Sequence, residues 1–204
     1  MSYPYAESMK QILEQEVESL AKLPEELDLE VVDQIVALLL KVKETGHKVL
    51  IAGCGTSGAA AKQIAHIMNV VMIPCFFLSP TGAIHGDLGA VSKDDVVILI
   101  TKGGQTPALL DYVEPCKTAG ATLIAVTENP ESDLAKGSDI ILKIKGDREA
   151  DPWGLVASTS SIAVMTILDA IILSTVPYSG FTKEDFLRIH AGGAVGVKLT
   201  NMLK

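Results

Sequence analysis

The sequence alternates short, continuous apolar runs with segments of helical periodicity, and this alternation restricts the fold more than any other feature. The apolar runs lie at 48–52, 72–78, 95–101, 122–127 and 139–143. Runs without polar alternation are typical of strands buried on both faces. Helical segments at 57–70, 106–119 and 132–136 separate most of them. The pattern predicts a doubly wound, flavodoxin-like α/β fold with a five-stranded parallel sheet between helices.

Two helices are expected before the first strand. Apolar residues recur at helical spacing over about residues 6–22 and again over 31–42. Pro24 is expected to end the first helix and Gly46 the second. No repeat, low-complexity tract or interdomain linker interrupts the chain, so residues 1–204 are expected to form a single domain.

Charge and cysteine content exclude several classes of protein. A net charge of −8 argues against a nucleic-acid binder, although one loop can still be locally positive and hold an anion. Cys54, Cys75 and Cys116 show neither zinc-site spacing nor a secreted disulfide framework. The first residues lack the basic start and apolar run of a signal peptide. We therefore expect reduced thiols, no metal and a cytoplasmic location.

One segment, 155–176, is long and apolar enough to raise the question of a membrane helix. It contains several hydroxyl groups and Asp169, and Pro177 follows it. Because such groups are costly in lipid, we interpret it as a buried helix of a soluble core and expect no membrane partner.

The loop at 53–58, Gly-Cys-Gly-Thr-Ser-Gly, follows the first predicted strand and opens a helix. Gly55, Thr56 and Ser57 are candidate ligand contacts, because glycines allow close backbone approach and a helix N terminus favours an anion. The spacing also fits a dinucleotide fingerprint, but the acidic residue expected about 20 positions later is missing. That absence disfavours a nicotinamide cofactor and an oxidoreductase. A tight turn without a ligand explains the loop equally well.

The loop after the third predicted strand carries further candidates for phosphate binding. Hydroxyls, free N–H groups and a lysine form a candidate phosphate cradle. Its candidate ligand residues are Thr101, Lys102, Gly103, Gln105 and Thr106. Thr106 also suits the N-cap of the next helix, and the two roles are compatible.

Four consecutive hydroxyl residues, beginning at Ser158, precede the long apolar helix. They are as consistent with phosphate contacts as with close helix packing. His85 and His190 lie in glycine-rich surroundings, which favours loops and a functional role.

Several motifs together resemble one family, the sugar isomerase (SIS) domains of arabinose 5-phosphate isomerases. They are the Gly-x-Gly-x-Ser-Gly loop at 53–58, His-Gly-Asp-Leu-Gly at 85–89, the hydroxyl run at 158–161, Gly-Phe-Thr-Lys-Glu-Asp-Phe at 180–186 and His-Ala-Gly-Gly-Ala at 190–194. The resemblance extends from about residue 7 to the end. Many members continue into CBS domains, so this chain resembles the shorter, SIS-only members.

The resemblance implies an aldose-ketose isomerase that acts on a sugar phosphate through an enediol and needs no cofactor. By position, it implies active-site roles for His85, His190 and Glu149. It further implies sugar-phosphate contacts from Ser57, Thr101 and Thr106. The family also forms homodimers or homotetramers whose active sites are completed across subunits, and the apolar N-terminal helices here are consistent with such packing.

Three residues depart from the family pattern. Thr56 stands where the family usually has Lys, Gln105 where it usually has Glu, and Gly103 where it typically has Ser. An amide cannot accept and return a proton as a carboxylate does. The first two departures motivate an alternative function, a sensor that binds a phosphosugar without converting it.

Overall fold

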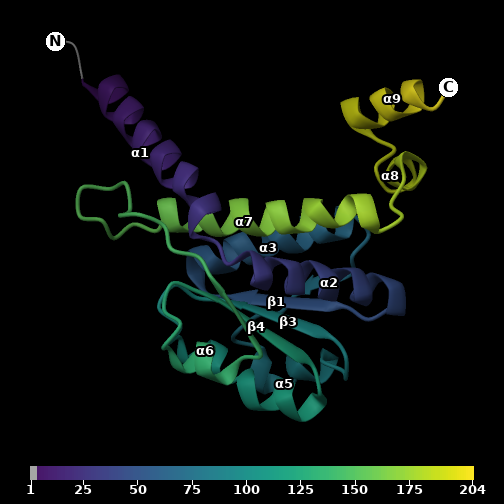
Figure 1. Cartoon of the computed structure of the whole chain (residues 1–204), viewed down its shortest axis with the longest axis horizontal. Helices are drawn as coiled ribbons and strands as arrows, with labels where there is room; N and C mark the ends of the chain where they lie inside the picture. Colours follow the sequence, from purple (N-terminus) through teal and green to yellow (C-terminus); the bar gives the residue numbers. More distant parts are fainter. Residues whose placement is uncertain (1–3) are drawn as a thin grey trace.

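The chain folds around one sheet of five strands in the order β2-β1-β3-β4-β5 (Figure 1). The structure, a computed structural model, describes residues 4–204. All neighbouring strands are parallel. The strands are β1 (Val49–Gly53), β2 (Cys75–Phe77), β3 (Val96–Ile100), β4 (Thr122–Thr127) and β5 (Ile140–Lys143). This strand order is the flavodoxin-like, doubly wound topology, so the predicted fold class is confirmed.

Helices precede, separate and follow the strands. They are α1 (Tyr5–Glu26), α2 (Leu29–Thr45), α3 (Gly55–Val70), α4 (Pro107–Leu110), α5 (Val113–Ala119), α6 (Asp133–Gly137), α7 (Thr159–Thr175), α8 (Lys183–Ile189) and α9 (Gly193–Met202). Short 3₁₀ helices are η1 (Ala83–His85), η2 (Asp87–Ala90) and η3 (Val176–Tyr178). Gly46 ends α2 in the left-handed conformation, as the sequence predicts.

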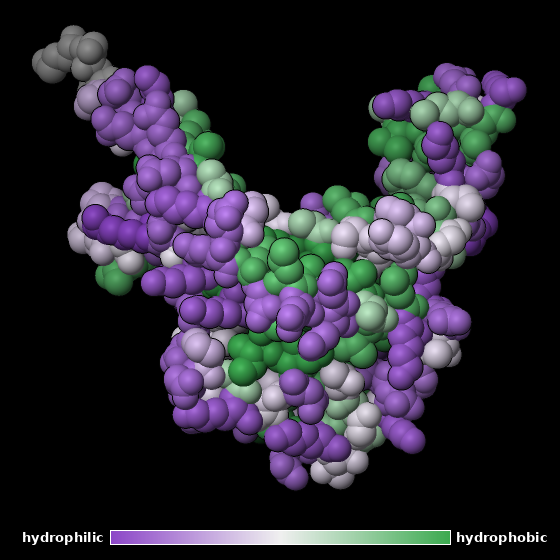
Figure 2. Space-filling view, viewed as in Figure 1, coloured by the Kyte–Doolittle hydropathy of each residue, from purple (hydrophilic) through white to green (hydrophobic). Residues whose placement is uncertain are grey.

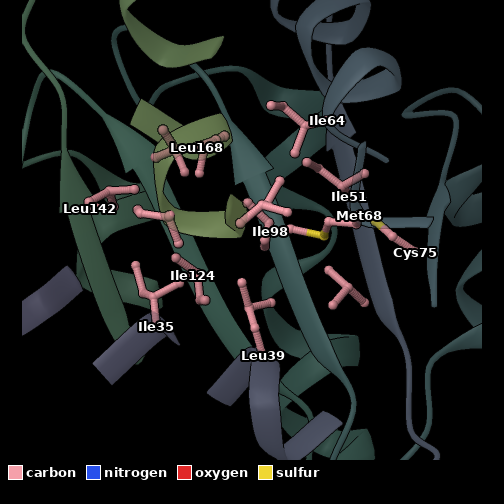
Figure 3. Packing of buried hydrophobic residues seen from close by; sticks show 14 of the residues in the cluster. Ile35, Leu39, Ile51, Ile64, Met68, Cys75, Ile98, Ile124, Leu142 and Leu168 are labelled. Carbon is pink, nitrogen blue, oxygen red and sulfur yellow. The ribbon is translucent and has the colours of Figure 1, made fainter. Parts of the chain in front are cut away.

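Both faces of the sheet are buried, which explains why the strands lack polar alternation. In β3, Ile98 packs into a cluster with α2, α3 and α7, whereas Leu99 packs into a second cluster on the opposite face with α4, α5 and α6. Figure 3 shows side chains of the first cluster, among them Ile35, Leu39, Ile51, Ile64, Met68, Ile98, Ile124 and Leu168. The three central strands, β1, β3 and β4, therefore each contribute apolar groups to two cores, whereas the edge strands β2 and β5 contribute to the first cluster.

Helix α7 crosses the outer side of this first layer (Figure 1). It packs against α1, α2 and α3, as expected of a core helix. By length and composition alone, the segment Thr159–Tyr178 is also apolar enough to cross a membrane. Its buried apolar side chains belong to the first cluster.

Three predicted boundaries are corrected by the structure. Pro24 does not end α1 but lies in its last turn, so it removes one backbone hydrogen bond and the helix ends two residues later. The helix predicted over 106–119 is split into α4 and α5. Pro115 lies in the first turn of α5 and has no N–H to donate to the carbonyl of Asp111, which lies in the break between the two helices. The strand predicted over 72–78 contracts to β2, since Met72 has a positive φ of 62° that extended backbone does not adopt.

Helix α1 and the α8–α9 segment extend away from the sheet, beyond α7 (Figure 1). The space-filling view shows a hollow between them whose floor and sides carry apolar residues (Figure 2). Exposed apolar side chains on these elements include Leu13, Val17, Leu173, Val195 and Met202.

Candidate functional site

A pocket lies at the carboxyl ends of β1, β3 and β4, where ligands bind in sheets of this type. It encloses about 450 Å³ of empty space, part of it open to solvent. The first turn of α7 closes one side of it. Its polar lining consists of Thr56, Ser57, Lys102, Thr127, Glu128, Ser160 and Ser161. The pocket thus combines five hydroxyl groups, one ammonium group and one carboxylate.

The loop after β1 is shaped by close backbone packing. A Cβ atom on Gly53 would lie 2.7 Å from the Ser57 carbonyl, and one on Gly58 would lie 2.6 Å from the Gly53 oxygen. These two glycines therefore serve the tight turn. Thr56 and Ser57 nevertheless reach the pocket from the first turn of α3. The turn and the ligand-contact interpretations are thus compatible.

The N terminus of α3 is open to a ligand. Within residues 4–204, no side chain caps the helix at Cys54. The first backbone N–H groups of a 16-residue helix have no partner in the helix and carry partial positive charge. An anion such as a phosphate group is favoured at this position.

Glu149 is held by donors from two elements. Its side chain accepts hydrogen bonds from Lys102 Nζ at 2.7 Å, Ser158 N at 2.9 Å and Ser160 N at 3.2 Å, and from the Ser160 hydroxyl. Glu149 lies in the charged stretch 147–151, which by sequence alone is equally consistent with a solvated loop. Only 3% of the residue is exposed, so Glu149 itself is not solvated. Ser158 thus contacts Glu149, while Ser160 and Ser161 line the pocket.

The hydrogen bonds decide the charge of this carboxyl group. Burial opposes its ionisation, but Lys102 and the donors around Ser160 outweigh burial and lower the pKa of Glu149 to about 2. Burial likewise acts to lower the pKa of Lys102, but its hydrogen bond to Glu149 and the charge of Glu128 raise it overall. A carboxylate with so low a pKa is a weak base at neutral pH, so these contacts favour a positioning role. The catalytic role implied by the resemblance stays a prediction.

Thr101 and Thr106 contact each other rather than lining the pocket. Their hydroxyl oxygens lie 2.8 Å apart, and among residues 4–204 Thr106 makes no side-chain cap to α4, although it occupies the N-cap position. Gly103 lies in the turn between them, with open space where a side chain would be. The role of these residues as phosphate contacts remains a prediction.

Gln105 is engaged with α6. With its amide in the hydrogen-bonded orientation, it donates to Asp133 Oδ2 at 3.0 Å and accepts from Asp133 N at 3.2 Å. It is not among the residues that line the pocket. This pairing explains an amide at position 105, since a carboxylate there would face a second carboxylate.

The two candidate histidines lie outside the pocket. His85 is exposed in η1, and His190 is exposed at the end of α8, where its ring meets the edge of Phe186 at 5.5 Å. His190 follows the far end of α7, whose 17 residues span about 25 Å. Within one chain, His190 is therefore remote from Ser160 and the pocket.

Sequence reasoning missed two pocket residues, Thr127 at the end of β4 and Glu128 directly after it. The signal was present, because the strand at 122–127 was predicted and ligands gather at carboxyl ends of parallel strands. Across residues 4–204, no group of three or more His, Cys, Asp or Glu side chains is arranged to hold a metal ion.

Comparison with known proteins gives a consistent result. The SIS domain family matches residues 44–174. Arabinose 5-phosphate isomerase KdsD of Pseudomonas aeruginosa is 38% identical over 152 residues, covering 74% of this chain and 47% of that protein. KpsF of Escherichia coli O6:H1, also an arabinose 5-phosphate isomerase, is 34% identical over 192 residues, covering 94% and 58%. The chain thus spans about half the length of the curated relatives it matches.

Solved structures agree with this similarity. A crystal structure from Listeria monocytogenes superposes with a TM-score of 0.90 at 39% identity, covering 94% of this chain and 100% of that chain. An E. coli CFT073 protein in complex with arabinose 5-phosphate superposes with a TM-score of 0.86 at 32% identity, covering 93% and 100%.

Proposed function

As this chain belongs to the SIS domain family, related to the arabinose 5-phosphate isomerases, we propose that it interconverts an aldose phosphate and a ketose phosphate through an enediol. The interconverted pair is arabinose 5-phosphate and ribulose 5-phosphate, or a related pair of sugar phosphates. The observation that carries the proposal is the pocket, in which hydroxyl groups and an open helix N terminus lie beside an ammonium group and a carboxylate.

Two parts of the pocket meet two different requirements of the reaction, phosphate binding and proton transfer. The hydroxyls of Thr56 and Ser57 and the backbone N–H groups of α3 suit the phosphate, which needs several hydrogen-bond donors. Proton transfer between adjacent carbons needs a group that accepts and returns a proton within hydrogen-bond reach. The charged groups at the ends of β3 and β4 suit this second task.

We further propose that the protein works as a homodimer or homotetramer. The stripe of exposed apolar residues on α1 includes Met9, Leu13 and Val17, and a helix that projects into solvent gains little stability by itself. A second copy seated in the hollow of Figure 2 would cover this stripe. The active-site role that the resemblance implies for His190 would then require His190 of the second copy to complete the pocket.

A thermal-shift screen followed by an exchange assay tests the function. A ligand that binds the native state raises its melting temperature, so pentose and hexose phosphates are ranked first by that shift. The best ligands are then incubated with the protein in D₂O and followed by NMR. Conversion of an aldose phosphate to the matching ketose phosphate is the expected result. Light scattering at micromolar concentration checks the assembly, and a monomer would contradict it.

A sensor that binds a phosphosugar without converting it is the second candidate. The pairing of Gln105 with Asp133 favours it, because that amide neither transfers protons nor faces the pocket. A strong thermal shift with neither conversion nor carbon-bound deuterium would support this second function and reject the first.

A further inference from the structure

Among the pocket-lining residues in the described part of the chain, Glu128 is the one carboxylate and Lys102 the one cation. The two are cross-strand neighbours just past the sheet. Ile100 pairs with Val126 in the register of β3 and β4, and two residues later the Glu128 N–H donates to the Lys102 oxygen at 3.0 Å. The strand register therefore fixes both side chains at the mouth of the same pocket.

Glu128 has an oxygen without a hydrogen-bond partner in the described part of the chain. Its Oε1 atom is buried, lies 3.7 Å from Lys102 Nζ, and makes no hydrogen bond within residues 4–204. Buried polar atoms are rarely left unpaired, and such an atom beside empty volume calls for a functional explanation. A bound substrate would supply the missing partner.

The pKa values of the two carboxyl groups beside Lys102 are shifted in opposite directions. Burial raises the pKa of Glu128, and the charge of Glu149 adds to this rise. The charge of Lys102 opposes the rise, and smaller opposing effects come from the Gly146 N–H and Lys145. Glu149, by contrast, stays ionised. Two neighbouring carboxyl groups with separated pKa values are a common basis for dividing acid–base and electrostatic roles.

We propose that Glu128 is the group that transfers the proton in the isomerisation, with Lys102 stabilising the negative oxygen and Glu149 positioning Lys102. The proposal rests on the proposed function and assigns its central chemical role. It follows from the place of Glu128 on the pocket wall, its buried oxygen that accepts no hydrogen bond within residues 4–204, and its adjacency to Lys102.

The proposed step is balanced within the substrate and this one side chain. Glu128 takes the proton from C2 of the aldose, and the electron pair of the broken C–H bond forms the C1–C2 double bond. The carbonyl π electrons move to O1, beside the Lys102 ammonium. Glu128 then returns the proton to C1 while the O2 proton passes to O1, giving the ketose. No oxidant, reductant or co-reactant is consumed.

The test compares Glu128→Gln, Glu128→Asp and a matched control, Glu131→Gln, in the full chain. Glu131 lies three residues further along, with 83% of its side chain exposed and only a 3.7 Å contact to Lys136. Each variant is assayed for conversion of the sugar phosphates that the wild type converts, for their dissociation constants, and for deuterium incorporation in D₂O.

We expect Glu128→Gln to lower kcat by roughly a hundredfold or more, the scale of a lost general base, and to remove deuterium incorporation. Its dissociation constants should change by no more than a few fold. Glu128→Asp should retain part of the activity, and Glu131→Gln all of it. The wild type should lose kcat/KM as pH falls through a pKa above the ordinary glutamate value, and Glu128→Gln should lack that limb.

Two outcomes would overturn the proposal, and they differ in what they imply for the isomerase function. An active wild type with Glu128→Gln within threefold of it rejects the role of Glu128 and leaves the isomerase function intact. A wild type that binds sugar phosphates but converts none rejects both. If circular dichroism shows that Glu128→Gln does not fold, Glu128→Asp becomes the test variant. Full activity of Glu128→Asp with an unaltered acidic limb of the pH profile would then reject the proposal.

Discussion

Replacing Glu149 with glutamine measures how much stability depends on the carboxylate beneath Lys102. The residue is only 3% exposed, and lowering its pKa from 4.5 to about 2 is a direct statement about stability. The difference corresponds to about 3 kcal/mol at pH 7. Because the folded-state pKa is the lower one, this stability is present above the unfolded value of 4.5 and is lost as pH falls through about 2.

The glutamine side chain keeps the shape but turns one of the two acceptors into a donor. That donor faces Lys102 Nζ if it replaces Oε1, or the backbone N–H groups of Ser158 and Ser160 if it replaces Oε2. We expect the free energy of unfolding to fall by about 3 kcal/mol at pH 7, which lowers Tm by about 6–12 °C in a chain of this size. At pH 3 the difference from wild type should shrink to about 1.4 kcal/mol, because the unfolded carboxyl group is then mostly protonated.

Urea unfolding at both pH values, at one fixed protein concentration, measures these differences. Glu131→Gln is the control, since an exposed charge contributes within about 0.5 kcal/mol. A loss below about 1 kcal/mol for Glu149→Gln at pH 7 would refute the reasoning. So would a loss of equal size at pH 7 and pH 3.

Three further substitutions have defined outcomes. Asp95→Asn should lower the free energy of unfolding by about 2 kcal/mol or more in denaturant titrations, because the buried carboxylate accepts from Lys48 Nζ at 2.7 Å; an unchanged midpoint would contradict it. Gln105→Glu should lower Tm at pH 7 and leave turnover unimproved, because its carboxylate would face Asp133; a gain in turnover would show that position 105 reaches the substrate. Ser57→Ala should weaken sugar-phosphate binding by about 1 kcal/mol or more in calorimetry, with little effect on the unphosphorylated sugar, and equal losses for both would indicate a role in the fold.

The sheet could be predicted from sequence because strands buried on both faces are continuous apolar runs. Ile98 and Leu99 are adjacent in the chain and enter different cores, so the strand has to be apolar throughout. The errors in the predicted elements concern backbone chemistry inside them. The helix breaks at residues 111–112, three to four positions before Pro115, although its apolar pattern continues. Met72 has a positive φ that its residue type does not predict.

The site was predictable only in part. The rule that ligands gather at strand carboxyl ends found Thr56, Ser57 and Lys102, and applied to β4 it would have found Glu128. The environment of Glu149 could not be predicted, because it depends on a contact with a residue 47 positions away. A charged stretch such as 147–151 looks solvated in sequence, and only the folded chain shows that one of its carboxylates is buried.

The charges in the pocket also define how a sugar phosphate would be oriented. In the strand order, β3 lies between β1 and β4, so Glu128 and the start of α3 are two strand spacings, about 10 Å, apart. A phosphate group beside Glu128 would be repelled by about 1–4 kcal/mol at 4 Å, whereas the α3 N terminus attracts it. We therefore expect the phosphate beside Ser57 and the carbonyl end of the sugar beside Lys102 and Glu128.

Binding of inorganic phosphate tests this orientation independently of turnover. With the phosphate near Ser57 and about 10 Å from Glu128, Glu128→Gln should change its dissociation constant by less than about threefold, since screening weakens a charge at that separation. Ser57→Ala should weaken the same binding several fold. If Glu128→Gln instead tightened phosphate binding tenfold or more, the phosphate would lie beside Glu128, and the sugar would have to enter the pocket in the opposite direction.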